Sequence, residues 1–175
     1  MDRDGTVIED KGHLSRPEDV APLAGAAEAL LSLQTAGFRL FVVTNQSGVG
    51  RGFFSLEDVQ RCNERLTQLM AQHGVRFERF YAAPETPDQP SRGRKPSPQF
   101  LFDARDQFAL DLPASFLIGD KLSDLQCGWN AGVKKSILVR TGFGRKVEQE
   151  MPGLLQAAVI VDDLPAAAKW ILGAT

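Results

Sequence analysis

The first residues whose types and spacing suit catalysis are Asp2 and Asp4, in the segment Asp2-Arg-Asp-Gly-Thr6. Two carboxylates that lie two residues apart at a strand end point to the same side, and a turn at Gly5 would leave both free to react. A carboxylate can attack phosphorus and form an aspartyl-phosphate, while a second one moves protons. An Asp-x-Asp pair is also common in turns, so this motif alone does not decide the function.

A second polar cluster, Thr44-Asn-Gln-Ser-Gly48, directly follows the apolar run 38–43. A hydroxyl group and successive backbone N–H groups at a strand end can hold phosphate oxygens. The alternative is a capped turn, because Asn, Ser and Gly all favour turns.

A third cluster, Arg94-Lys95, lies in the proline-rich segment 84–98, which we expect to be a loop. Folded over a reaction centre, Lys95 would neutralise charge on a phosphoryl group, and Arg94 would bind a substrate oxygen. The alternative is a pair of solvated surface cations.

The fourth cluster is Gly119-Asp-Lys-Leu-Ser-Asp124, in which Asp120 follows the apolar run 116–118. A carboxylate here can join the first Asp pair around Mg²⁺, which prefers oxygen ligands. Asp124 begins a predicted helix, so it either interacts with the helix dipole or supports the site.

The elements that must position these clusters alternate between strand and helix, which predicts a doubly wound α/β fold with a mostly parallel sheet and helices on both faces. All four clusters fall at strand ends or in a loop, where such sheets bind ligands. No insertion is long enough for a large cap. Predicted helices cover residues 23–36, 55–74 (with Ser55 as N-cap), 98–109, 124–131 and 165–172. Predicted strands cover 38–43, 77–83, 115–119, 135–139 and 158–161.

One expected element is nearly missing from the sequence. A strand of four or five apolar residues should precede Asp2, yet only Met1 stands there. We therefore predict one domain, residues 1–175, with a truncated first strand. That strand would hold the nucleophile in place.

Composition limits the function classes. The 175 residues are 43% hydrophobic and 24% charged, with a formal net charge of -2, which gives no electrostatic reason to expect binding to duplex nucleic acid or an anionic membrane. Cys62 and Cys127 are too few for a disulfide framework. The sequence shows no signal peptide and no membrane-spanning run, so we expect a cytoplasmic monomer.

Taken in order, the four clusters resemble the signature of the haloacid dehalogenase-like (HAD) phosphatases. The resemblance implies that Asp2 is the nucleophile and Asp4 the general acid and base. It implies Mg²⁺ bound by Asp2, the backbone carbonyl of Asp4 and Asp120, a phosphoryl group held by Thr44 and Lys95, and a supporting role for Asp124. The implied substrate-binding residues are Asp10, His13, Asn45, Gln46, Ser47, Arg51, Arg94 and Lys121.

The segments Asp10-Lys-Gly-His13, Thr44-Asn-Gln-Ser-Gly-Val-Gly-Arg-Gly52 and Arg94-Lys-Pro96 resemble those of subfamily IIIA. This subfamily includes heptose-bisphosphate and histidinol-phosphate phosphatases, and the resemblance implies a sugar phosphate substrate. Members usually carry three Cys and one His as zinc ligands before the Arg-Lys-Pro motif. Here Ala83, Glu85, Ser91 and Gly93 align with those positions, so we expect no zinc.

Three other interpretations stay open from the sequence. Two are enzymes, a histidinol-phosphate phosphatase and a polynucleotide 3′-phosphatase. The third is a sugar-phosphate-binding module without catalysis, which the truncated first strand favours slightly and the complete set of catalytic residues opposes.

Overall fold

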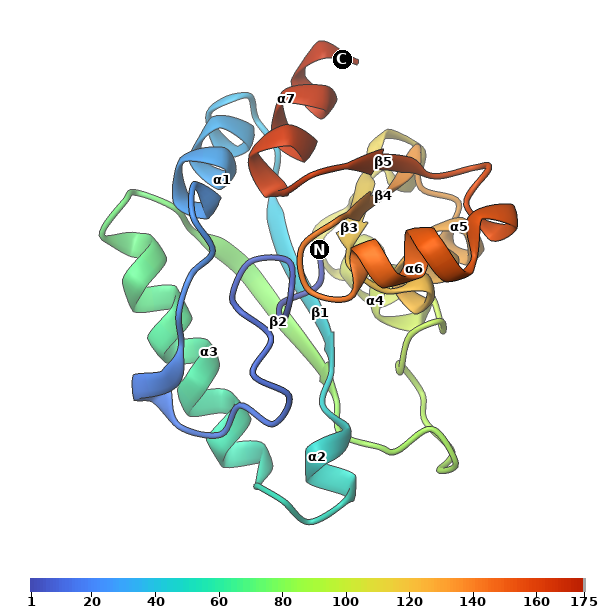
Figure 1. Ribbon diagram of the computed structural model, residues 1–175. Helices are drawn as coiled ribbons and strands as arrows, with labels where there is room; N and C mark the ends of the chain where they lie inside the picture. The colour runs from blue at the N-terminus through green and yellow to red at the C-terminus, as the bar shows by residue number, and fades with distance from the viewer. Residues whose placement is uncertain (175) are drawn as a thin grey trace.

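The computed structural model describes residues 1–174 as an α/β protein in which helices lie on both sides of parallel strands (Figure 1). The strands are β1 (Leu40–Asn45), β2 (Phe77–Ala83), β3 (Phe116–Gly119), β4 (Lys135–Val139) and β5 (Val159–Val161). The helices are α1 (Ala26–Thr35), α2 (Ser47–Gly50), α3 (Leu56–Ala71), α4 (Gln99–Phe108), α5 (Leu122–Ala131), α6 (Gly144–Glu150) and α7 (Leu164–Gly173). Short 3₁₀ turns cover Pro17–Asp19, Leu112–Ala114 and Pro152–Leu154.

The strands form two parallel sheets, one of β1 and β2 and one of β3, β4 and β5. Met1 and Asp2 join them. The N–H group of Val43 in β1 donates to the carbonyl oxygen of Met1 at 2.9 Å, and the N–H group of Asp2 donates to the carbonyl oxygen of Ile118 in β3 at 2.8 Å. The spatial order is therefore β2, β1, Met1–Asp2, β3, β4, β5, which confirms the predicted doubly wound fold.

Successive side chains of β3 point to opposite faces of the sheet, so neighbouring residues pack against different helical layers. Ile118 packs in the cluster that contains Leu30 of α1, Leu66 of α3 and Ile171 of α7. Leu117, its neighbour, packs instead with residues of α4 and α5. The prediction of helices on both faces is confirmed, and the described residues contain no separate cap domain.

Strand and helix positions agree closely with the sequence pattern wherever the periodicity is strong. Helix α3 begins with the predicted cap, because Ser55 and Asp58 form a reciprocal capping box. Helices α2 and α6 were not predicted. The first has only four residues, two of them glycine, and the second begins at Gly144, so neither gives an amphipathic repeat.

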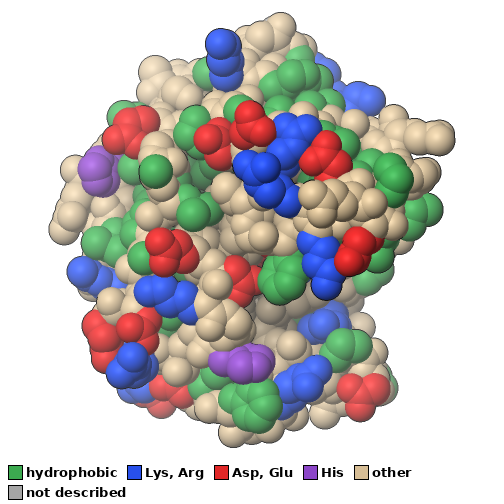
Figure 2. All heavy atoms as spheres, in the orientation of Figure 1, with side chains coloured by type: hydrophobic (Ala, Val, Ile, Leu, Met, Phe, Trp, Pro, Cys, Tyr) green, Lys and Arg blue, Asp and Glu red, His purple; other side chains and the backbone are tan. Residues whose placement is uncertain are grey.

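Among residues 1–174, no helix is both long enough and apolar enough to span a membrane. On the face drawn in Figure 2, acidic and basic side chains are interspersed and form no continuous basic stripe.

Candidate active site

Asp2 lies between the two sheets, where it is 4% exposed. Its backbone is fixed through the hydrogen bond to Ile118, and its Oδ1 accepts a hydrogen bond from the N–H group of Arg3 at 2.8 Å. Burial raises the pKa of the Asp2 carboxyl, but Lys95 and Lys121 outweigh it and hold that pKa below its usual range. Asp2 is therefore ionised, which is the form in which a carboxylate can act as a nucleophile.

Asp4 is held by the side chains of Arg3, Gln46 and Thr44, and the Thr44 hydroxyl donates to Asp4 Oδ2 at 3.4 Å. The guanidinium group of Arg3 donates to both carboxylate oxygens at 3.1 Å. Gln46 donates to Asp4 Oδ2 at 2.9 Å and to the hydroxyl of Thr44 at 2.7 Å. These contacts bring the first and second sequence clusters together and fix the orientation of the second carboxylate.

Arg3 was not singled out in the sequence, although it separates the two aspartates. It is 1% exposed, and its Nη1 donates to Asn63 Oδ1 of α3 at 2.7 Å. A buried arginine needs such partners, because an unpaired guanidinium N–H is costly. Arg3 thus links the orientation of Asp4 to helix α3.

Replacing Asn63 by Leu is expected to lower kcat roughly tenfold while KM for an aryl phosphate changes little, because Asp4 loses its fixed orientation but the phosphate-binding groups remain. Stability should fall by about 1–3 kcal/mol, the cost of an unsatisfied buried donor. Steady-state kinetics and thermal unfolding measure both. Thr67→Val, one turn further along α3, is the matched control; an equal loss of kcat there would contradict the link.

Lys95 is the central cation of the site and is 3% exposed. Its ammonium group lies 2.8 Å from Asp2 Oδ1 and 2.5 Å from Asp124 Oδ1, and it donates to the carbonyl oxygen of Val43 at 2.7 Å. Burial by itself would lower the pKa of Lys95, but Asp124 and Asp2 raise it. Lys95 is therefore charged throughout the physiological range.

Asn45 holds the backbone of Lys95 from the end of β1. Its amide accepts from the Lys95 N–H group at 2.9 Å and donates to the Lys95 carbonyl oxygen at 3.0 Å. The family resemblance implies a substrate contact for Asn45, and this side chain lines the pocket beside Asp2. In the structure it also aligns Lys95 with strand β1.

Asp120 is fully buried at the end of β3. Its Oδ2 accepts from the N–H group of Phe143 at 2.8 Å, but its Oδ1 is buried without a hydrogen-bond partner. Gly5 and Gly142 both approach this carboxylate so closely that a Cβ atom at either position would lie 2.4 Å or less from Asp120 Oδ2. Burial, and then the nearby charge of Asp2, raise the pKa of Asp120 to about 8.

Asp124 has both of the roles that the sequence left open. Its Oδ2 accepts from the N–H group of Lys121 at 2.9 Å and so caps helix α5. Its Oδ1 forms the ion pair with Lys95. Asp124 therefore supports the site by fixing the lysine, and both of its oxygens are engaged.

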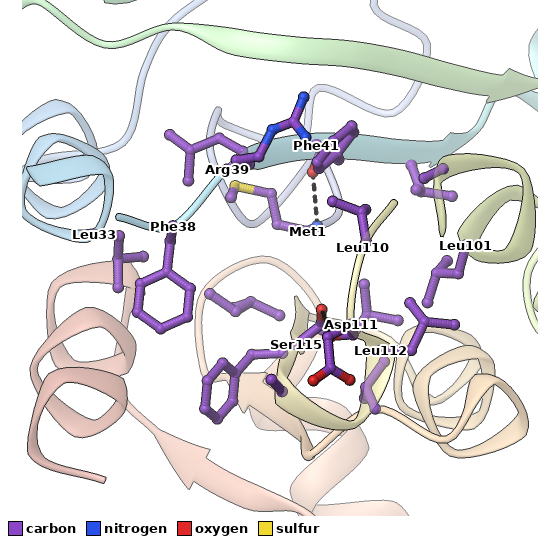
Figure 3. Close-up of a pocket in the computed structure, with 18 of the residues that line it drawn as sticks. Met1, Leu33, Phe38, Arg39, Phe41, Leu101, Leu110, Asp111, Leu112 and Ser115 are labelled. Carbon is purple, nitrogen blue, oxygen red and sulfur yellow. Dashed lines mark hydrogen bonds between the residues drawn. The ribbon is translucent and has the colours of Figure 1, made fainter. Parts of the chain in front are cut away.

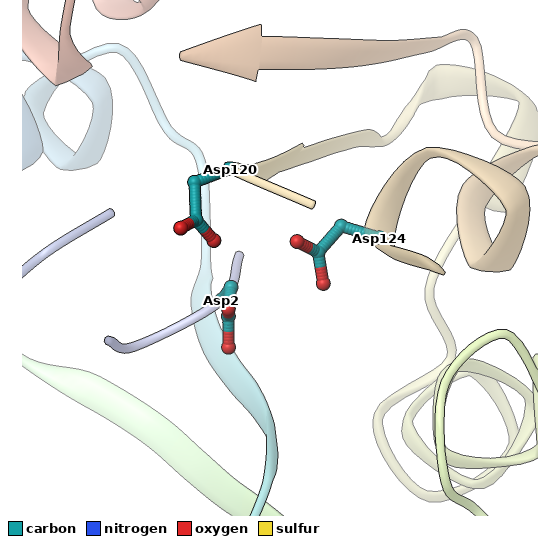
Figure 4. Close-up of side chains that lie close together, drawn as sticks. All are labelled: Asp2, Asp120 and Asp124. Atoms are coloured by element: carbon teal, nitrogen blue, oxygen red, sulfur yellow. The ribbon is translucent and has the colours of Figure 1, made fainter. Parts of the chain in front are cut away.

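Asp2, Asp120 and Asp124 can each place one oxygen within 4.8 Å of the other two (Figure 4). Around them, five carboxylates face three cations: Arg3 pairs with Asp4, Lys121 with Asp10, and Lys95 is shared by Asp2 and Asp124. The excess negative charge and the unpaired oxygen of Asp120 fit a hard divalent cation with oxygen ligands.

The raised pKa of Asp120 predicts how the metal-free protein responds to pH. Between the ordinary value of 3.8 and about 8, the folded protein keeps a proton that the unfolded chain releases. The free energy of unfolding therefore falls as pH rises through this window. At pH 8 without metal, Asp120→Asn should raise Tm by roughly 5 °C.

Adding MgCl₂ should raise Tm of the parent protein at pH 8 and leave Asp120→Asn nearly unchanged, because a ligand stabilises only the state that binds it. Thermal unfolding with EDTA and with MgCl₂ checks both expectations. A metal-dependent shift of equal size in the two proteins would show that Asp120 is not a ligand.

The reactive groups open into a pocket of about 70 Å³. The expected site residues that line it are Asp2, Asp4, Asp10, His13, Thr44, Asn45, Gln46, Ser47, Lys95, Lys121 and Asp124. Arg51, Arg94 and the buried Asp120 do not line it. His13 packs edge-on against Phe53 at 4.7 Å, so the rim of the pocket contains aromatic side chains that the sequence motifs did not indicate.

The loop before Arg94 is held by hydrogen bonds at the positions that align with zinc ligands. Ser91 donates to Glu85 Oε2 at 2.7 Å and accepts from the N–H group of Arg94 at 3.0 Å. Phe100 lies directly against Gly93. Absence of zinc stays a prediction, which metal analysis of the purified protein would test.

Comparison with known proteins decides the family. A family model described as HAD-hydrolase-like matches residues 93–167. A D-glycero-D-manno-heptose-1,7-bisphosphate 7-phosphatase from Chlorobaculum tepidum is 38% identical over 99% of this chain and 93% of its own length. The chain belongs to the HAD-like hydrolase family. The sequence-based assignment to HAD-like phosphatases is thereby confirmed.

Two further relatives agree with it. D-glycero-beta-D-manno-heptose-1,7-bisphosphate 7-phosphatase from Escherichia coli K12 is 36% identical over 97% of this chain and 92% of its own length. The crystal structure of D,D-heptose 1,7-bisphosphate phosphatase from B. bronchiseptica, complexed with magnesium and phosphate, has a TM-score of 0.92 at 31% identity and covers 99% of this chain and 97% of its own.

Proposed function

We propose that this chain is a Mg²⁺-dependent phosphatase that removes the 7-phosphate from D-glycero-D-manno-heptose 1,7-bisphosphate through an aspartyl-phosphate on Asp2. The observation that carries the chemistry is the buried carboxylate cluster beside Lys95, with an unpaired oxygen on Asp120. The names of the relatives at 36–38% identity support the substrate.

In the first half-reaction, an Asp2 carboxylate oxygen forms a bond to phosphorus while the bond from phosphorus to the sugar oxygen breaks. Lys95 and the Thr44 hydroxyl stabilise the phosphoryl oxygens, and Asp4 gives its proton to the departing sugar oxygen. Asp2 and Asp120 would hold Mg²⁺, with the carbonyl oxygen of Asp4. When bound, Mg²⁺ supplies positive charge beside the phosphoryl group.

In the second half-reaction, Asp4 is a carboxylate and takes a proton from water. That water forms a bond to phosphorus, the bond to the Asp2 oxygen breaks, and free phosphate leaves. Arg3 and Gln46 keep Asp4 in one orientation for both steps. The cycle returns Asp2 to its ionised form, which Lys95 and Lys121 favour.

The pair Arg51 and Arg94 supports a substrate with a second anionic group. Arg94 donates to the carbonyl oxygen of Glu85 at 2.9 Å and is half-buried. Burial lowers the pKa of Arg94, the nearby carboxylate of Glu85 raises it, and the nearby charge of Arg51 lowers it. Two neighbouring cations outside the reaction pocket suit the 1-phosphate of a bisphosphate. A guanidinium group can donate two parallel hydrogen bonds to the oxygens of one phosphate.

The experiment that tests this function is phosphate release from heptose 1,7-bisphosphate, histidinol phosphate and a 3′-phosphorylated oligonucleotide, with MgCl₂ and with EDTA. We expect kcat/KM to be highest for the bisphosphate and activity to disappear with EDTA. Arg94→Met should raise KM for the bisphosphate about tenfold and leave an aryl monophosphate unaffected. Higher kcat/KM for either rival substrate would overturn the assignment.

A further inference from the structure

The connection between β4 and α6 touches two parts of the reaction centre that are far apart in the sequence. The Thr141 hydroxyl donates to the carbonyl oxygen of Gly5 at 2.6 Å. Two residues later, the N–H group of Phe143 donates to Asp120 Oδ2 at 2.8 Å. The segment 141–143, which we call the clamp, therefore joins the turn after Asp4 to the buried carboxylate at the end of β3.

Gly142 brings the clamp into direct contact with both parts. A Cβ atom at this position would lie 2.2 Å from Asp120 Oδ2 and 2.8 Å from the Cα atom of Gly5. Its φ of 53° lies in the left-handed region, which glycine adopts without strain. The backbone can therefore lie against Gly5 and Asp120 because position 142 has no side chain.

Hydrogen bonds fix both peptide groups next to the Cα atom of Gly5. On one side, the Gly5 N–H group donates to the carbonyl oxygen of Ile8 at 2.8 Å, so the Asp4 carbonyl oxygen of the same planar peptide group points the opposite way. On the other side, Thr141 holds the Gly5 carbonyl oxygen. Because glycine rotates freely about both backbone bonds, the direction of the Asp4 carbonyl group depends on Thr141 as well as on the local turn.

The clamp also decides which oxygen of Asp120 is available. Oδ2 accepts from Phe143 and is covered by Gly142, whereas Oδ1 is buried and has no hydrogen-bond partner among residues 1–174. A carboxylate with one engaged oxygen and one free oxygen offers a single ligand atom in a fixed direction. Partners of this kind orient the ligands of a metal and tune its affinity.

Arg140 fixes the other end of the clamp. Its N–H group donates to the carbonyl oxygen of Val161 in β5 at 3.0 Å. Its guanidinium group donates to both carboxylate oxygens of Glu148 in α6, at 2.7 and 2.8 Å, and such bidentate pairs have a defined geometry. The position of the clamp is therefore set by β5 and α6, and not only by the turn that it contacts.

We infer that Thr141 is a positioning residue of the phosphatase reaction, and that the clamp sets the Asp4 carbonyl oxygen and Asp120 Oδ1 relative to each other. Thr141 does not line the reaction pocket, so it acts through Gly5 and not by contact with substrate. The inference rests on the proposed Mg²⁺-dependent function, because these two oxygens are ligands only if the metal binds here.

Thr141→Val tests the inference, because it removes the hydroxyl group and keeps the shape of the side chain. The Kd for Mg²⁺, obtained from the dependence of Tm on MgCl₂ concentration, should rise about tenfold. For an aryl phosphate at saturating MgCl₂, kcat should fall about tenfold while KM stays unchanged. Without metal, hydrogen exchange of the Phe143 amide should be faster by about tenfold.

Two further variants separate positioning from packing. Thr141→Ser keeps the hydroxyl group, so all three quantities should stay within about twofold of the parent values. Ser115→Ala is the matched control, because its hydroxyl also donates to a backbone carbonyl oxygen, that of Asp111 at 2.6 Å. Both residues line the apolar pocket of about 370 Å³ drawn in Figure 3, which shares no lining residue with the reaction pocket. Ser115→Ala should leave the Kd for Mg²⁺ and kcat unchanged.

A Thr141→Val protein with the parent's Kd for Mg²⁺ and the parent's kcat would overturn the inference. Equal impairment in Thr141→Ser would do the same, because the role of the residue would then lie in packing and not in its hydroxyl group. A parent protein whose Tm and activity do not respond to MgCl₂ would overturn the proposed function and this inference with it. The parent alone therefore distinguishes the two failures.

Discussion

Phosphate release by Asp2→Asn is expected to fall by about 10⁴-fold or more, because an amide is too weak a nucleophile to form the phosphoryl-enzyme. Asparagine has the shape of aspartate and can still accept the hydrogen bond from the Arg3 N–H group. The fold should therefore persist. Phosphate release from an aryl phosphate with MgCl₂ measures the loss, and circular dichroism checks the fold.

Asp106→Asn is the matched control for this change. Asp106 is an exposed aspartate on α4 whose only role in the described residues is an ion pair with Arg105. Its removal should leave both rate and Tm within experimental error. Metal-dependent rates near those of the parent in Asp2→Asn would contradict the assignment of the nucleophile.

Lys95→Met is expected to cause the largest loss of stability, about 3–5 kcal/mol, because two buried carboxylates lose their shared cation. Tm should fall by roughly 10 °C. Phosphate release should fall as well, since Lys95 no longer neutralises charge on the phosphoryl group. Thermal unfolding and kinetics at one pH measure the two effects separately.

A second substitution separates the structural from the catalytic effect. Asp124→Asn in the Lys95→Met background removes one of the unpaired charges, so Tm should recover by half or more while activity stays lost. Recovery of activity together with Tm would show that Lys95 acts only by holding the fold together.

The fold was predictable because its signals are local. The apolar runs of β2 and β4 end at the residues that the sequence pattern indicates, and Ser55 caps α3 as expected. Three of the four motifs meet at one edge of the sheet because they lie at the ends of parallel strands, which end at the same edge, and the loop after β2 brings Lys95 to that edge. Neither step requires knowledge of distant contacts.

The residues that were missed depend on contacts between distant parts of the chain. Arg3 donates to Asn63, sixty positions away in the chain. Asn45 was named from the sequence, but its hydrogen bond to the backbone of Lys95, fifty positions away, was not foreseen. Gly142, which follows β4, lies against the Asp120 carboxylate at the end of β3, where a Cβ atom would clash. Such pairings have no periodicity in the sequence, so they can be identified only in the folded structure.

We expect the phosphoryl group to be bonded covalently to the Asp2 carboxylate during turnover. Borohydride trapping tests this expectation most directly. Borohydride reduces an acyl phosphate to the alcohol, which converts an aspartyl-phosphate into homoserine. Enzyme quenched during turnover with MgCl₂ should contain homoserine at position 2, found by mass spectrometry of the N-terminal peptide, and enzyme without substrate should not. Turnover with an unmodified position 2, or with homoserine at another aspartate, would contradict the account.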